Sequence, residues 1–221
     1  SISGPALRAL SGTIRNFGAT TWSGGSIDFL NGSFRNQSGG VFMAQSTGSL
    51  TGTGTFGNLG LMQRTVSGTA TISGLSLTNT GSISPAAGTL LLVPAGGTFF
   101  NNGALSVVAG SVVQVTGSLI QSAGSSLTVG IANANPITGS GRLLVSGTAQ
   151  LLNRPLTITF MGGYTPSKTH SFNFLNAGAT TGNFGLVTLP SPTGGLGAQL
   201  VFGANGVTLR FGRPPMIVAS P

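Results

Sequence analysis

The sequence contains no cysteine and no glutamate, and it has one aspartate, Asp28, and one histidine, His170. The lack of cysteine excludes disulfides and thiolate metal sites. A single carboxylate side chain excludes the carboxylate pair of ordinary glycosidases and calcium sites built from repeated aspartates. A Ser-His-Asp triad would need Asp28 and His170 together, but they are 142 residues apart. We therefore expect no catalysis, no cofactor and no metal site.

Charge is also scarce. The 221 residues include nine Lys or Arg and one Asp, which gives a net charge of +8. The mean hydropathy is +0.37, yet no apolar run approaches the roughly 18 residues that a membrane-spanning helix needs. The 38 glycines interrupt every apolar stretch. The first four residues lack the basic start and apolar middle of a signal peptide. We expect neither a membrane span nor a signal peptide in this sequence.

The most regular feature is a short recurring phrase: a glycine, a hydroxyl residue, an apolar residue and then an amide. A glycine follows each amide within three residues. Counted through the amides, the successive separations are 20, 22, 21, 23 and 19 residues, so the period is about 21 residues. The six amides are Asn16, Asn36, Asn58, Asn79, Asn102 and Gln121.

A period in this range is typical of a solenoid, whose repeats stack to build one continuous core. The residues between the apolar positions are mostly Gly, Ser and Thr, which favour strands and turns over helices. We expect strands such as 90–93 and 112–115, separated by glycine-rich corners. The predicted fold is therefore all-β, a right-handed parallel β-helix of about 21 residues per coil, with the hand taken from the crossover rule.

The recurring amides have a mechanical interpretation. Asparagine tolerates the left-handed backbone conformation of a corner. Equivalent side chains on neighbouring coils lie roughly 4.8 Å apart, so their amides can hydrogen-bond in a ladder. The sequence predicts such a ladder through the six amides. The alternative is that each amide is only a turn residue.

Two kinds of residue suggest a ligand surface. Arg15 and Arg35 occupy the same repeat position, so they should stack on one face. The nine cations, Arg64 among them, either solubilise a neutral surface or meet an anionic partner such as an acidic polysaccharide or lipopolysaccharide. They are too scattered for a nucleic-acid patch. Trp22, followed by Gly24, indicates an aromatic residue packed at a corner, with a carbohydrate-stacking platform as the alternative.

The pattern divides the chain into four parts. Residues 1–9 are expected to form an N-terminal arm or cap, and residues 10–136 the β-helix coils. A proline at 136 interrupts the period. Residues 137–211 are expected to hold the last coils and a β-hairpin cap, and residues 212–221 an extended, proline-containing tail that adds to another subunit's edge or serves as a linker. The expected cap strands are 172–174, 182–184, 199–202 and 206–211.

The second half of the chain carries a family resemblance. Its segments are 141–151, 156–158, 171–177, 182–184 and 207–209. This succession resembles the C-terminal passenger region of autotransporters and related surface-adhesin β-helices, and the preceding Gly-Thr-Phe-x-Asn coils are similar to passenger repeats. The resemblance covers about residues 10–211. It implies a parallel β-helix and a secreted, extracellular or cell-surface location.

Three functions remain open. The first is a non-catalytic structural solenoid that self-associates into a filament or surface layer, because unpaired sheet edges at a solenoid end must be capped or joined to another chain. The second is an adhesin or spike-like rod that binds an anionic surface glycan through Arg15, Trp22 and Arg35. The third is an ice-binding solenoid that uses threonines such as Thr51, Thr53 and Thr55.

Overall fold

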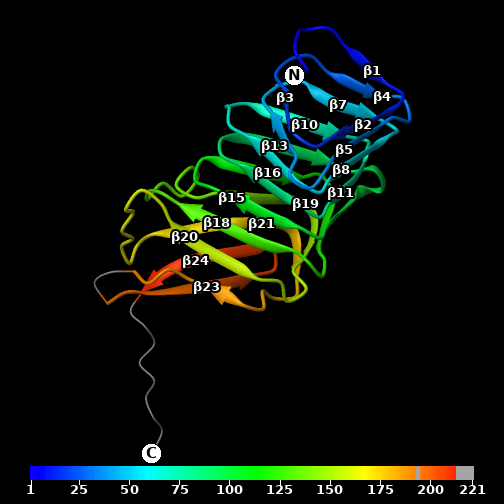
Figure 1. The fold of residues 1–221 in the computed structure, drawn as a ribbon. Helices are drawn as coiled ribbons and strands as arrows, with labels where there is room; N and C mark the ends of the chain where they lie inside the picture. The colour runs from blue at the N-terminus through cyan, green and yellow to red at the C-terminus, as the bar shows by residue number, and fades with distance from the viewer. Residues whose placement is uncertain (193–194, 213–221) are drawn as a thin grey trace, which may run out of the picture.

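Three walls of parallel strands enclose one core, because each coil contributes one short strand to each wall (Figure 1). The structure is a computed structural model that describes residues 1–192 and 195–212. Each coil takes about 22 residues. The chain is thus an all-β parallel solenoid, as the sequence predicts. The hand of the coil stays a prediction.

Each wall is named here after its first strand. The β1 wall consists of β1 (Arg8–Leu10), β4 (Ile27–Phe29), β7 (Ser49–Gly52), β10 (Thr69–Ser73), β13 (Gly88–Val93) and β16 (Ser111–Val115). The β2 wall consists of β2 (Thr13–Asn16), β5 (Ser33–Asn36), β8 (Thr55–Asn58), β11 (Ser76–Asn79), β14 (Thr98–Asn101) and β17 (Ser118–Gln121). The β3 wall consists of β3 (Ala19–Trp22), β6 (Val41–Ala44), β9 (Leu61–Arg64), β12 (Ser82–Pro85), β15 (Ala104–Val107), β18 (Ser126–Ile131), β20 (Leu156–Phe160) and β22 (Val187–Thr188).

Inward side chains stack in register along the axis, because parallel strands align residue for residue. On the β2 wall, for example, Phe34 pairs with Phe56 and Phe56 with Leu77. The phenyl rings of Phe34 and Phe56 stack with centroids 5.3 Å apart. The same alternation places every second residue of a strand outside. The core is therefore one continuous apolar column.

The coils change character after β18. β19 (Arg142–Gln150) is long enough to pair with both β16 and β17, so it joins the β1 and β2 walls into one sheet. β21 (Ser171–Thr181) lies parallel to β19. β23 (Gly197–Gly203) and β24 (Gly206–Gly212) form an antiparallel hairpin, and β24 also pairs antiparallel with β21. These strands cover the C-terminal end of the core (Figure 1).

The C-terminal strands confirm most of the predicted cap and correct one detail. Residues 172–174 belong to β21, where Phe172 and Asn173 pair antiparallel with β24 as predicted, whereas from Leu175 onward β21 also pairs parallel with β19. Residues 182–184 form no strand; the short strand nearby is β22, which pairs parallel with β20. The expected strands 199–202 and 206–211 lie within β23 and β24. Of the tail, residues 213–221 lie outside the described residues.

At the N-terminus, Arg8–Leu10 already belongs to the first coil as β1, and Ile2 forms a bridge with Trp22. Within the described part of the chain, one short 3₁₀ turn (Ala95–Gly97) is present and no helix has the length and apolarity that a membrane span requires.

Candidate functional site

An amide ladder runs along the inside of the β2 wall. Each strand of this wall ends in an amide that points inward, and the amide nitrogen of each of the first five donates to the amide oxygen of the next coil. The five N···O distances are 2.7–2.8 Å. All six residues are buried. They are Asn16, Asn36, Asn58, Asn79, Asn101 and Gln121.

The prediction that Asn102 belongs to this ladder is wrong, because Asn101 occupies the position. Along β14, Phe99 points inward and Phe100 outward, so the two-residue period turns Asn101 inward and leaves Asn102 exposed. Through Asn101 the ladder separations become 20, 22, 21, 22 and 20 residues. These are more even than the separations through Asn102, and this evenness was the signal available in the sequence.

The ladder has protein neighbours at both ends. Asn16 Oδ1 accepts a hydrogen bond from Thr20 Oγ1 at 2.9 Å. At the other end, Gln121 Nε2 is buried and has no hydrogen-bond partner among the described residues. Ile120 pairs with Gln150, so the next ladder position is Leu151, which is apolar and buried. The ladder is therefore an internal support of the corner.

In the middle coils, the glycine that follows the amide is required by the stacking. A Cβ at Gly60 would lie 2.2 Å from the carbonyl oxygen of Gly40, one coil earlier. The same contact would be 2.1 Å at Gly81 and 2.0 Å at Gly103. At these three positions, neighbouring coils approach too closely for a side chain. The Asn and Gly of the repeat are thus explained by packing alone.

Trp22 is fully buried, which confirms the expected packing at a corner and shows that the alternative, a glycan platform, is wrong. The indole Nε1 donates to the carbonyl oxygen of Gly25 at 3.0 Å, and the ring stacks on Phe42 with centroids 6.5 Å apart. Trp22 ends β3 in the inward phase of the strand, which places it in the core corner. No face of the ring is left for a sugar.

Arg15 and Arg35 lie on the outer surface of the β2 wall. They are direct cross-strand partners between β2 and β5, and both are exposed. Neither side chain makes a hydrogen bond or ion pair with any residue in 1–192 or 195–212. Beside Arg35 lies a groove of about 310 Å³, also lined by Thr55, Gly57 and Thr78. Arg35 itself lines this groove.

Two outward rows run along this wall parallel to the axis. In the hydroxyl row, Thr55 Oγ1 donates to Ser33 Oγ at 2.8 Å. The hydroxyl row is Thr13, Ser33, Thr55, Ser76, Thr98 and Ser118. The mixed row is Arg15, Arg35, Gly57, Thr78, Phe100 and Ile120. Because the mixed row has one hydroxyl residue, a Thr-x-Thr pair does not recur on this wall.

The sequence analysis grouped Arg64 with the surface cations, but the structure buries its side chain. Its guanidinium is fully buried and donates to the carbonyl oxygens of Ala44 and Ser46, both at 2.8 Å, and of Ser67 at 2.6 Å. Burial lowers the pKa of this guanidinium from its ordinary value. The side chain occupies the β3 wall's inward corner position, so it supports the turn. The phase of β9, with Met62 and Arg64 inward, was the signal.

The two residues that a hydrolytic triad would share lie far apart. Asp28 is on β4, in a coil at the N-terminal end, whereas His170 directly precedes β21 near the C-terminal cap (Figure 1). His170 Nδ1 lies 2.6 Å from the Tyr164 hydroxyl and accepts from the Ser167 amide at 3.1 Å. Burial raises the pKa of Tyr164. The absence of catalysis stays a prediction, but Asp28 and His170 do not meet.

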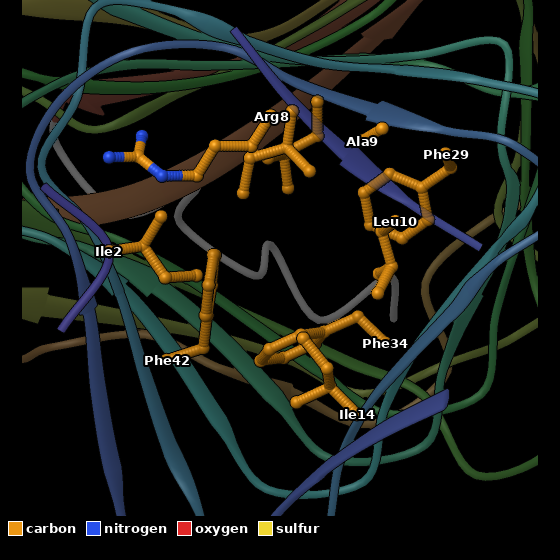
Figure 2. A pocket seen from close by; sticks show the side chains of 10 residues that line it. Ile2, Arg8, Ala9, Leu10, Ile14, Phe29, Phe34 and Phe42 are labelled. Carbon is orange, nitrogen blue, oxygen red and sulfur yellow. The ribbon is translucent and has the colours of Figure 1, made fainter. Parts of the chain in front are cut away.

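Within residues 1–192 and 195–212, no strand covers the N-terminal end of the core. In the described chain β2 pairs only with β5, and β1 only with β4, so both have a free edge. A cavity of about 130 Å³ opens there, lined by apolar side chains and Arg8. Figure 2 shows Ile14, Phe34 and Phe42 around this opening. We call this end, formed by β1, β2 and β3, the N-terminal mouth.

Inward side chains of the β2 wall are more exposed at the mouth than in the following coils. Ile14 is 40% exposed, whereas its partner one coil below, Phe34, is 3% exposed. Arg8 lies across the opening, and its guanidinium donates to the carbonyl oxygens of Ser3 and Ala6. Ile2 covers only the end of β3, at Trp22.

Comparison with protein-family models finds no match for this chain, and comparison with curated proteins finds none either. The molecule is thus placed by its architecture, a parallel β-solenoid of about six turns. Among the described residues, two surface features with unpartnered groups are the N-terminal mouth and the arginine-bearing outer surface of the β2 wall.

Proposed function

We propose that this chain is a non-catalytic structural β-solenoid that associates with its own copies into a filament or surface layer. The observation that carries the proposal is the N-terminal mouth, which combines free strand edges with an exposed end of the apolar core. Unpaired edges of this kind pair readily with another chain. The contact would bury Ile14 and complete the hydrogen bonds of β2.

A second copy fits the mouth because it presents the same surface. Two mouths related by a two-fold axis would pair their free edges antiparallel, with each copy contributing the same residues. Closing the apolar opening in this way also buries the exposed apolar side chains of both copies. Filament growth needs a second contact, and β23 supplies a candidate, because it pairs only with β24 among the described strands.

A secreted, extracellular or cell-surface setting is part of the proposal. The resemblance to autotransporter passenger and surface-adhesin β-helices supports this setting, and the lack of cysteine does not conflict with it. Stacking of neighbouring coils supplies stability in place of disulfides.

The test is sedimentation velocity over a concentration series. We expect larger species to grow with concentration in the wild type. The substitution Ile14→Lys should shift this equilibrium toward the monomer by at least tenfold, because it places a charge in the mouth. The matched control is Leu186→Lys, because Leu186 is 72% exposed on a loop near the other end of the solenoid.

Circular dichroism checks that both variants keep the wild-type β signal. A wild-type protein that stays strictly monomeric up to millimolar concentration would overturn the proposal. Equal dissociation in the Ile14→Lys and Leu186→Lys variants would place the contact elsewhere and remove the mouth from it.

A further inference from the structure

We infer that the outer surface of the β2 wall binds a linear acidic polysaccharide that lies along the solenoid axis. This inference is independent of the assembly proposal, since it uses a side wall rather than the mouth. The binding track is the mixed row from Arg15 to Phe100. Along this row, cationic groups, an open groove and an aromatic ring follow one another on successive coils.

The cationic end of the track lacks a negative partner. Arg15 and Arg35 are opposite each other on adjacent strands, an arrangement in which like charges repel. Asp28, the chain's one carboxylate side chain, lies on the β1 wall. An anionic group placed between the two guanidinium groups would replace this repulsion by two attractions. Arginine forms bidentate hydrogen bonds with both carboxylate and sulfate-like oxygens, so either group fits.

The groove lies directly beyond Arg35. Gly57 takes the next place in the mixed row, so the wall has no side chain there. A Cβ at Gly57 would lie 3.3 Å from Thr78 Oγ1, so a side chain at position 57 would occupy this part of the groove. Hydroxyl groups of Thr55, Ser76 and Thr78 line the groove. These groups donate and accept hydrogen bonds, as the hydroxyls of a sugar require.

The aromatic end of the track is Phe100, which the sequence reasoning did not single out. It follows Thr78 in the mixed row and is 51% exposed. Exposed aromatic rings provide a flat apolar surface for the apolar face of a sugar ring. Four strand spacings separate Arg15 from Phe100, or roughly 19 Å. This length suits an oligosaccharide segment rather than a single sugar.

A linear polysaccharide fits better than an acidic polypeptide because the centre of the track is a groove with three hydroxyl side chains in its lining. Strand addition, the usual way of binding an extended peptide, requires a free sheet edge. The strands from β5 to β14 are paired on both sides. The track therefore offers side chains, not backbone, to its ligand.

The experiment is titration calorimetry at low salt with four probes: sulfated heparin oligosaccharides, carboxylated polygalacturonate oligosaccharides, neutral dextran and polyglutamate. We expect both acidic saccharides to bind and dextran not to bind. The double substitution Arg15→Gln/Arg35→Gln should weaken saccharide binding at least tenfold and reduce its salt dependence. The control Arg210→Gln removes an exposed arginine from β24 and should change affinity less than twofold.

Two further variants test the rest of the track. Gly57→Leu fills the groove and Phe100→Ala removes the ring, and each should weaken saccharide binding at least threefold. The control Leu186→Ala should have no effect. Unchanged affinity in both track variants, or equal losses in Arg210→Gln and the double variant, would overturn the inference. Polyglutamate binding as tight as saccharide binding, insensitive to Phe100→Ala, would assign the surface to an acidic polypeptide instead.

Discussion

Replacing Asn101 by leucine tests whether the amide ladder stabilises the solenoid. Asn101 Oδ1 accepts from Asn79 Nδ2 at 2.7 Å, and Asn101 Nδ2 donates to Gln121 Oε1 at 2.8 Å. Leucine has nearly the same size but makes neither bond. Asn79 Nδ2 and Gln121 Oε1 would then remain buried without these partners. Leaving each unpaired costs about 1–3 kcal/mol, so the variant should lose about 2–6 kcal/mol in free energy of unfolding.

Asn102 provides a matched control in the next residue. It is exposed, and its side chain makes no hydrogen bond within the described part of the chain. Asn102→Leu should therefore change stability by less than about 0.5 kcal/mol. The pair separates the ladder from any general effect of placing leucine at this corner.

Hydrogen exchange with mass spectrometry locates the damage. Each coil contacts mainly its neighbours, so Asn101→Leu should loosen the coils around β11, β14 and β17 before the hairpin β23–β24. Urea unfolding gives the size of the loss. Equal exchange in the Asn101→Leu and Asn102→Leu variants, or uniform loosening of the chain, would refute the ladder as a source of stability.

Three further predictions follow from the packing. Arg64→Met should lower the free energy of unfolding by about 2–4 kcal/mol because buried carbonyls lose charged donors, while exposed Arg35→Met should have almost no effect in the same urea titration. Gly81→Ala should cost about 1–3 kcal/mol through overpacking, whereas thermal melting of Gly18→Ala should match the wild type, since nothing lies within 4 Å of a Cβ at Gly18. Thermal hysteresis should be absent, because the hydroxyl row of the β2 wall has no second row of hydroxyl residues beside it. A measurable gap between melting and freezing temperatures would restore the ice-binding alternative.

The architecture could be predicted because the same corner packing recurs along the solenoid and selects the same residue types each time. The corner of the middle coils needs an inward amide and a glycine without a Cβ, and both appear in the sequence at nearly constant spacing. Asn102 was misassigned because two amides are adjacent there, and only the alternation of Phe99 and Phe100 decides between them.

The burial and contacts of individual side chains were harder to predict than the arrangement of the coils. Trp22 and Arg64 both end β3-wall strands in the inward phase, yet residue type left a surface platform open for Trp22 and suggested a surface role for Arg64. Arg64 is stable inside because neighbouring turns aim carbonyl oxygens at it, and turn geometry has no periodic signal. Phe100 was missed for the opposite reason, since an aromatic residue in a repeat usually indicates core.

The most direct test of the central claim is energy transfer between copies labelled at the N-terminal mouth. The chain has no cysteine, so Thr13→Cys on β2 gives one unique dye site, and Ser106→Cys on β15 gives a control site in the middle of the solenoid. Donor-labelled and acceptor-labelled copies are mixed at a concentration where sedimentation shows association. We predict strong transfer for the Thr13→Cys pair and much weaker transfer for the Ser106→Cys pair. Transfer that is absent at position 13, or no stronger there than at position 106, would contradict the claim that the mouth joins two copies.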